Sequence, residues 1–131
     1  AWPSDATERA LVAQAGISVN NAPSCTKVGQ TSCTSLAGLN TSGVIALKKT
    51  KCTTCEIIIT GGTECWLHSS KTQHLPGNSI VDLRPTTTLT SYIDEAKNKI
   101  TSTGMPFPVY LKDNTKFMRE SNPDHYHIIN W

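Results

Sequence analysis

All four histidines of the chain fall into two clusters, and each cluster has an aspartate nearby in the sequence. The two sets are His68, His74 and Asp82, and Asp124, His125 and His127. Imidazole and carboxylate groups are common zinc ligands, and two histidines with one carboxylate leave a fourth tetrahedral position open to water. This distribution predicts a zinc site of the catalytic type.

The spacing within each set indicates how the ligands would be positioned. His74 would lie on a loop and Asp82 on the next strand, with Gly77 allowing the turn between them. His125 and His127 would share one face of a terminal strand, because strand side chains repeat every two residues. One of these two histidines would bind the metal while the other faces the same pocket.

A third carboxylate is suited to proton transfer. Zinc lowers the pKa of a bound water to about 7, and a neighbouring carboxylate can then accept a proton during attack on an amide. Asp124, three residues before His127, is the predicted base. His125 is predicted to hydrogen-bond the developing oxyanion.

Length and composition predict one domain spanning residues 1–131. The 131 residues are 37% hydrophobic, which suffices for a single core. A net charge of +2 without a long basic run argues against a nucleic-acid partner. No apolar stretch approaches the roughly 20 residues that cross a bilayer, so we expect no membrane partner. We also expect a monomer.

The five cysteines lie in the first half of the chain, at Cys25, Cys33, Cys52, Cys55 and Cys65. The short polar segment between Cys25 and Cys33 predicts a disulfide, and the other three leave one sulfur unpaired. The CTTC spacing would also suit a zinc knuckle or a redox pair, but a second close cysteine pair is missing, which favours a disulfide. Cysteines among many Ser, Thr and Gly residues are typical of secreted, extracellular proteins.

Hydrophobic periodicity predicts an alternation of helices and strands. Helices are expected at residues 5–15, 40–49 and 89–100, with Asp5 as a cap, and strands at 17–19, 56–60, 80–83, 109–111 and 125–131. The order of these elements predicts an α+β fold with helices packed on a mainly antiparallel sheet. The long irregular stretch 63–79 is expected to be functional, as such loops usually are.

The segment TQHLPGNSIVDL resembles the Ser-x-His-x-x-Gly-x-Ala-x-Asp motif of the LAS zinc peptidases, the family M15 group. That group includes D-alanyl-D-alanine carboxypeptidases, L-alanyl-D-glutamate endopeptidases and the Hedgehog signalling domain. Together with CTSLAGL, IIITGGTE and the histidine-rich end, the chain is similar to a subgroup of small secreted microbial proteins with a TGGTE motif. The resemblance spans residues 15–131.

The resemblance implies a LAS/Hedgehog-like fold with zinc held by His74, Asp82 and His127, and Asp124 as the acid/base. Aligning the end of the chain by its aromatic residue instead makes His125 the ligand and Glu120 a more distant base. Where the family often has a substrate-holding arginine, this chain has Thr63 and Glu64.

Three functional hypotheses follow. The first is a secreted zinc metallopeptidase, a carboxypeptidase or endopeptidase, that hydrolyses amide bonds in peptidoglycan peptides of the bacterial cell wall. The second is a noncatalytic secreted zinc-binding module that recognises a partner or a cell-wall peptide. The third, a disulfide-rich protein without metal, requires the clustered His and Asp residues to be coincidental. His68 is a candidate to line the pocket, and Glu64 is expected to cap the glycine turn before it.

Overall fold

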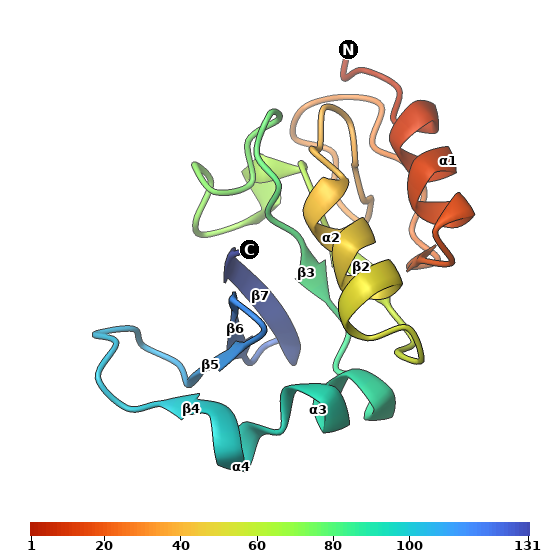
Figure 1. The fold of residues 1–131 in the computed structure, drawn as a ribbon. Coiled ribbons are helices and arrows are strands. Elements are labelled where there is room, and N and C mark those ends of the chain that lie inside the picture. The colour runs from red at the N-terminus through yellow and green to blue at the C-terminus, as the bar shows by residue number, and fades with distance from the viewer.

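The computed structural model covers residues 1–131 and shows an α+β domain built on one seven-stranded sheet (Figure 1). The strand order is β1-β2-β3-β7-β6-β5-β4. Only the β1–β2 pair is parallel, and all the others are antiparallel. The predicted fold class, helices on a mainly antiparallel sheet, is confirmed.

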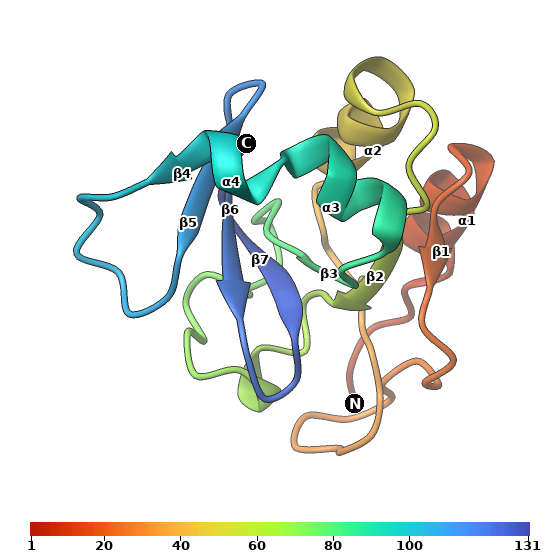
Figure 2. The ribbon, with the colours of Figure 1, turned by 90° about the horizontal axis from the view of Figure 1, so that it is seen from below.

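The strands are mostly short. They are β1 (Ser18–Val19), β2 (Ile58–Gly61), β3 (Asp82–Leu83), β4 (Lys99–Ile100), β5 (Val109–Lys112), β6 (Thr115–Glu120) and β7 (His125–Asn130). Strands β5, β6 and β7 form an antiparallel meander and lie side by side in Figure 2. Strand β3 joins β7 to β2, so residues from the middle and the end of the chain meet at the centre of the sheet.

The helices are also short. They are α1 (Ala6–Gln14), α2 (Ser42–Ala46) continued by a π-helical turn (Leu47–Lys51), a 3₁₀ turn (Cys65–Leu67), α3 (Thr87–Ile93) and α4 (Glu95–Asn98). The helix predicted at 89–100 is therefore broken. Asp94 adopts a left-handed conformation with φ of 51°, which ends α3, and the chain enters β4 at Lys99.

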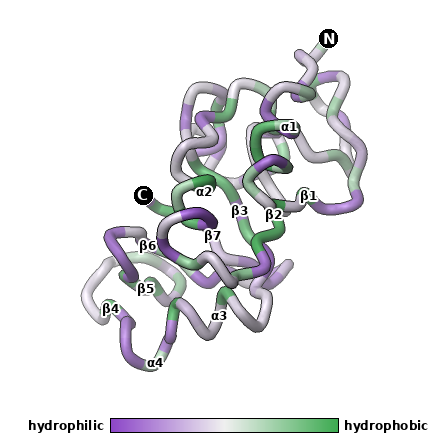
Figure 3. Tube along the Cα trace, turned by 45° about the vertical axis from the view of Figure 1, so that its right-hand side comes forward, coloured by the Kyte–Doolittle hydropathy of each residue, from purple (hydrophilic) through white to green (hydrophobic).

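One hydrophobic core lies between the helices and one face of the sheet. Val12 of α1, Val44 of α2 and Ile93 of α3 belong to the same buried cluster as Tyr126 and Ile128 of β7. The apolar stretches of the chain gather where α2, β2 and β3 lie together, whereas the chain around α4 is more polar (Figure 3). Because strand side chains alternate, His125 and His127 lie on the sheet face opposite Tyr126 and Ile128.

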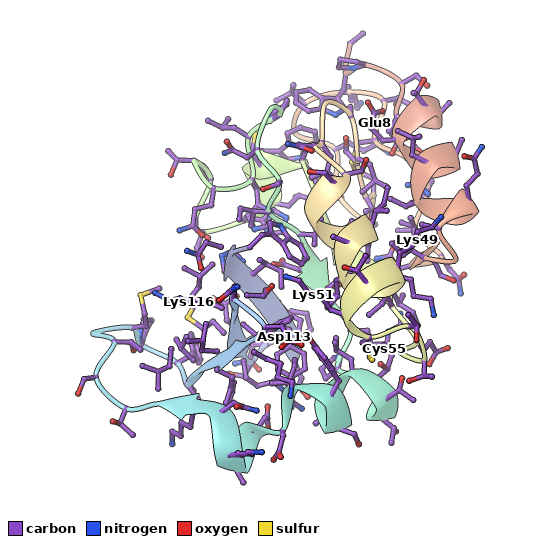
Figure 4. The ribbon with its side chains drawn as sticks, viewed as in Figure 1. Glu8, Lys49, Lys51, Cys55, Asp113 and Lys116 are labelled. Atoms are coloured by element: carbon purple, nitrogen blue, oxygen red, sulfur yellow. A yellow bond between two sulfur atoms is a disulfide. The ribbon has the colours of Figure 1, made fainter.

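Two disulfides and a lysine contact add further links to the fold. Disulfides join Cys25 to Cys33 and Cys52 to Cys55, and Cys65 is the free cysteine. The predicted first pair and the disulfide interpretation of CTTC are both confirmed. Lys51 donates to the backbone oxygen of Asp113 at 2.9 Å, which ties the end of the α2 segment to the β5–β6 turn (Figure 4). No helix is both long and apolar enough to cross a membrane.

Asp5 is a buried anchor rather than a helix cap. It stands at the N-cap of α1 but makes no capping hydrogen bond. Instead its carboxylate accepts from Leu36 N at 2.9 Å, Arg9 Nε at 2.8 Å and Ser24 Oγ at 2.9 Å. Burial alone would raise the pKa of Asp5, but these hydrogen bonds outweigh it and hold the pKa below its ordinary value of 3.8.

This network predicts an acid-sensitive contribution to stability. Asp5→Asn should lower the free energy of unfolding at pH 7 by about 2–4 kcal/mol, because a buried acceptor of several donors is replaced by an amide. The folded-state pKa is depressed, so the contribution of the carboxylate is present above pH 3.8 and is lost as the pH falls through the lower folded-state value. Urea unfolding at a series of pH values from 7 down through the acid range measures this. The exposed Glu56→Gln is the control, and a loss in Asp5→Asn that does not shrink as the pH falls would contradict the role of the charge.

Candidate metal centre

The centre is assembled from three separate segments. Asp82 is on β3 and His127 is on β7, and the two residues are direct partners in the sheet register. His74 comes from the irregular segment between the 3₁₀ turn and β3. All three side chains are buried, and their potential ligand atoms lie within 4.8 Å of one another. The structure thus brings together the three residues predicted as ligands.

His74 presents a free nitrogen to this centre. Its Nδ1 lies 2.7 Å from the backbone oxygen of Gly62, and because a carbonyl only accepts, Nδ1 must carry the proton. Its Nε2 then carries no proton and has a free lone pair. This nitrogen is the one buried side-chain polar atom without a hydrogen-bond partner. Burial lowers the pKa of His74, which favours the neutral ring that metal binding requires.

His127 presents the other ring nitrogen, Nδ1, to the centre. Its Nε2 lies 2.6 Å from Gln73 Oε1, an acceptor, so that nitrogen is the donor. Its Nδ1 therefore faces Asp82 Oδ1, 2.9 Å away, with a lone pair in the neutral ring. Two acceptors at this distance require a shared cation between them, either a proton or a metal ion. A ligand histidine whose other nitrogen is held by an acceptor is the usual arrangement at metal sites.

The distances suit a tetrahedral ion. Asp82 Oδ1 lies 3.7 Å from His74 Nε2 and 2.9 Å from His127 Nδ1. Zinc with ligands at 2.0–2.1 Å holds neighbouring donor atoms about 3.3 Å apart, between these two values. Burial raises the pKa of Asp82, but its hydrogen bond to His127 and its other histidine neighbours outweigh that effect and lower the pKa overall. Asp82 is thus ionised at neutral pH and would be an anionic ligand to a metal.

A second group, Glu64, His68 and His74, also lies within ligand distance. Here, however, the Glu64 carboxylate already accepts from Ser35 N at 2.8 Å, from Gly62 N at 2.9 Å and from His68 Nε2. A carboxylate with its oxygens so occupied is a poor ligand. The set of His74, Asp82 and His127 is the better metal site.

Glu64 instead holds His68 in place. Sequence reasoning expected Glu64 to cap the glycine turn, and it does accept from Gly62 N, but its bond to His68 was not foreseen. The His68 ring stacks on His74, with centroids 3.6 Å apart, and its Nδ1 lies 3.4 Å from Asp82 Oδ2. Burial lowers the pKa of His68, but Glu64 and Asp82 raise it by more.

The two glycines of the TGGTE segment make room for this packing. A Cβ on Gly61 would lie 2.9 Å from both Asp82 Oδ2 and His68 Cε1. A Cβ on Gly62 would lie only 2.2 Å from the Ser35 backbone oxygen. Close approach of the backbone, rather than an unusual φ angle, therefore requires glycine at both positions.

The centre lies in a cleft of about 430 Å³. The lining residues are Thr60, Leu67, His68, Ser69, Ser70, His74, Asp82, Phe107, Glu120, Ser121, Asn122, Pro123, His125 and His127. The volume is within the usual range for small-molecule sites. The irregular stretch 63–79 supplies five of these residues, in keeping with its predicted functional role.

Asp124, the predicted base, is not among the lining residues. Its two oxygens accept from Arg119 Nε at 2.6 Å and Arg119 Nη2 at 2.8 Å, and its side chain is 59% exposed. The pKa of Asp124 is lowered chiefly by this hydrogen-bonded pairing. The physical reason is strand geometry: a residue three positions before His127 in an extended chain points to the other face.

Glu120, and not Asp124, is the carboxylate that lines the cleft beside the centre. It pairs with His125 across β6 and β7, so both side chains share the face that holds the metal centre. Glu120 Oε1 lies 2.7 Å from His125 Nε2, and that nitrogen lies 3.7 Å from Asp82 Oδ2. Hydrophobic periodicity did not single out the strand 115–120; only the alternative alignment of the end of the chain named Glu120 as a candidate base.

No family model, no curated protein and no solved structure matches the chain. What is established is an α+β domain with two disulfides and a buried His/Asp cluster able to hold a metal ion.

Proposed function

We propose that this protein is a zinc-dependent peptidase that hydrolyses amide bonds in the peptides of bacterial cell walls. The observation that carries the proposal is the unpartnered Nε2 of buried His74, which faces Asp82 and His127 beneath the cleft. The resemblance of TQHLPGNSIVDL to the LAS peptidases supports the reaction and the class of substrate. Zinc is the preferred ion because two imidazoles and one carboxylate are its usual catalytic ligand set.

Glu120 is the base in this proposal. A zinc ion held at the centre would polarise the scissile carbonyl and make water a nucleophile at neutral pH. Glu120 lines the same cleft and is placed to take a proton from the attacking water and return it to the leaving amine. The net reaction breaks the amide C–N bond, adds hydroxyl to the carbonyl carbon and adds a proton to the nitrogen.

His125 supports this role by holding the Glu120 side chain in position. Its Nδ1 lies 2.5 Å from the backbone oxygen of Pro123 and must donate to it. Its Nε2 then contacts Glu120 Oε1 only with a further proton between them. Both ring nitrogens of His125 are thus engaged, one by Pro123 and one by Glu120, so His125 orients Glu120, and the oxyanion contact expected of it from the sequence stays a prediction.

Asp124 should be dispensable for turnover. Asp124→Asn removes one charge of an exposed ion pair with Arg119, which contributes little, so kcat/KM should stay within about threefold of wild type. The readout is the release of new amino groups from purified peptidoglycan. A loss of a hundredfold or more with zinc retained would restore Asp124 as the base and contradict the assignment of Glu120.

The same release assay tests the function itself. Zinc-loaded protein should generate amino groups, chelated protein should not, and zinc should restore the release. Stoichiometric zinc without release from several peptidoglycan types would favour the noncatalytic zinc-binding module. The observation that favours this second function is that Asp124, the base implied by the resemblance, is held by Arg119 outside the cleft.

We also propose that the protein is secreted and acts as a monomer. Two disulfides suit an oxidising, extracellular compartment, where cell-wall peptides are accessible.

A further inference from the structure

Gln73 contacts the metal centre although it is not among the lining residues of the cleft. Its Oε1 lies 2.6 Å from Nε2 of His127, a proposed ligand whose exposed fraction is 2%. Gln73 directly precedes His74, the ligand that comes from the irregular segment. Two neighbouring residues of one segment therefore reach two ligands: His74 presents its own nitrogen, and Gln73 holds the ring of His127.

A neutral His127 has two tautomers, and only one of them can bind a metal at this centre. With the proton on Nε2, the ring donates to Gln73 and turns the Nδ1 lone pair toward the centre. With the proton on Nδ1, the ring donates to Asp82 Oδ1, 2.9 Å away, and this hydrogen bond occupies two proposed ligand atoms at once. The charge of the carboxylate strengthens such a hydrogen bond, so Asp82 favours the tautomer that blocks the centre.

The side-chain oxygen of Gln73 acts against the blocked tautomer. An amide oxygen only accepts, so it stabilises His127 when Nε2 carries the proton and faces a lone pair when Nε2 does not. Two acceptors 2.6 Å apart repel each other. Gln73 thus favours the tautomer that leaves His127 Nδ1 and Asp82 Oδ1 free for a metal ion.

The backbone around Gln73 is held by hydrogen bonds that do not involve its side chain. The side-chain amide of Asn78 donates to the backbone oxygens of Thr72 at 2.9 Å and of Gln73 at 3.2 Å. Gly77 N donates to Gly38 O at 2.8 Å, which docks the segment against the chain that precedes α2. A substitution of the Gln73 side chain should therefore leave the segment folded.

We propose that Gln73 is a positioning residue of the metal centre: it fixes the tautomer of His127 that is protonated on Nε2, so that Nδ1 is the atom that binds the metal. This inference rests on the zinc site of the proposed function, but it depends on neither the reaction nor the substrate. Hydrogen-bond partners of ligand histidines typically change metal affinity by about 10–100-fold when they are removed.

Two substitutions of similar size separate the acceptor from the bulk of the side chain. Gln73→Leu removes the acceptor, and the zinc Kd, measured by calorimetric titration against a competing chelator, should weaken by about 10–100-fold. Gln73→Glu keeps an acceptor and cannot turn an amide donor toward the ring, so it should bind zinc at least as tightly as wild type. Lys71→Ala, an exposed change in the same segment, is the control and should leave the Kd unchanged. Thermal unfolding of the zinc-free variants should match that of the zinc-free wild type.

Nitrogen-15 NMR of the His127 ring gives a readout that a merely structural role would not move. In zinc-free protein at about pH 10, well above the ordinary titration range of histidine, the ring shifts distinguish the two neutral tautomers. Wild type and Gln73→Glu should show the proton on Nε2. Gln73→Leu should shift the population toward the tautomer with the proton on Nδ1, donated to Asp82.

Three results would overturn the inference: an unchanged zinc Kd in Gln73→Leu, an unchanged tautomer of His127 in that variant, or an equal loss of zinc affinity in Gln73→Leu and Gln73→Glu. A wild-type protein that binds no zinc would overturn it together with the proposed function. If zinc binding responds as expected but no peptide is cleaved, the positioning role of Gln73 stands and the proposed peptidase activity fails.

Discussion

Glu120→Gln should reduce amide hydrolysis by about 10²–10⁴-fold while leaving zinc binding intact, because it removes the base without removing a ligand. The glutamine keeps the size of the side chain and its hydrogen-bonding capacity toward His125, so the loss reports on proton transfer. The loss should appear in kcat, because proton transfer to Glu120 takes place in the transition state. The release of amino groups from peptidoglycan measures the loss of hydrolysis, and the zinc content of the same samples shows whether the metal is retained.

The matched control is Glu56→Gln, an exposed carboxylate outside the cleft, which should change kcat by less than twofold. Activity retained in Glu120→Gln and lost in Asp124→Asn would contradict the assignment of the base. Loss of zinc in Glu120→Gln would show that Glu120 acts on the metal instead.

His74→Ala should have the largest effect on the metal. Binding free energies of about 10–16 kcal/mol for four-ligand zinc sites correspond to roughly 2.5–4 kcal/mol per ligand, so the zinc Kd should weaken by roughly 10²–10³-fold. Zinc should also stop raising the Tm, because a ligand stabilises a fold only as far as it binds the folded state. Calorimetric zinc titration and thermal unfolding with and without zinc measure these effects.

Lys71→Ala, an exposed change in the same irregular segment, is the control and should leave both quantities unchanged. If His74→Ala binds zinc as tightly as wild type, then the unpartnered nitrogen is not a ligand. Because His74 belongs to both candidate groups, Glu64→Gln and His127→Ala distinguish them: if Glu64→Gln weakens zinc binding more than His127→Ala does, the metal belongs to the alternative group.

Much of the fold follows from local patterns in the sequence. Residues 5–15 and 40–49 contain helices near the expected bounds, and the β-branched run at 56–60 became β2 with 80–83 as its neighbour. The strand Thr115–Glu120 was missed because lysine and arginine interrupt its alternation, and only its pairing with β5 and β7 fixes it. The break at Asp94 was missed because the apolar spacing continues past it.

The candidate centre was predictable in its candidate ligands but not in its surroundings. Histidines and aspartates in two clusters indicate a candidate metal site by composition, and strand periodicity correctly places His125 and His127 on one face. The choice of Asp124 rested on a spacing of three residues, which brings side chains together in a helix but separates them in a strand. Glu64 with His68, and Gln73 with His127, are tertiary pairs that no local pattern could have indicated.

The central claim is that a zinc ion binds between β3, β7 and the irregular segment before β3. Anomalous diffraction at the zinc absorption edge, from crystals of the zinc-loaded protein, tests it most directly. We predict one peak per chain within about 2.0–2.2 Å of His74 Nε2, Asp82 Oδ1 and His127 Nδ1. A peak on Glu64 and His68, or none at all from protein shown to be zinc-saturated in solution, would contradict the claim.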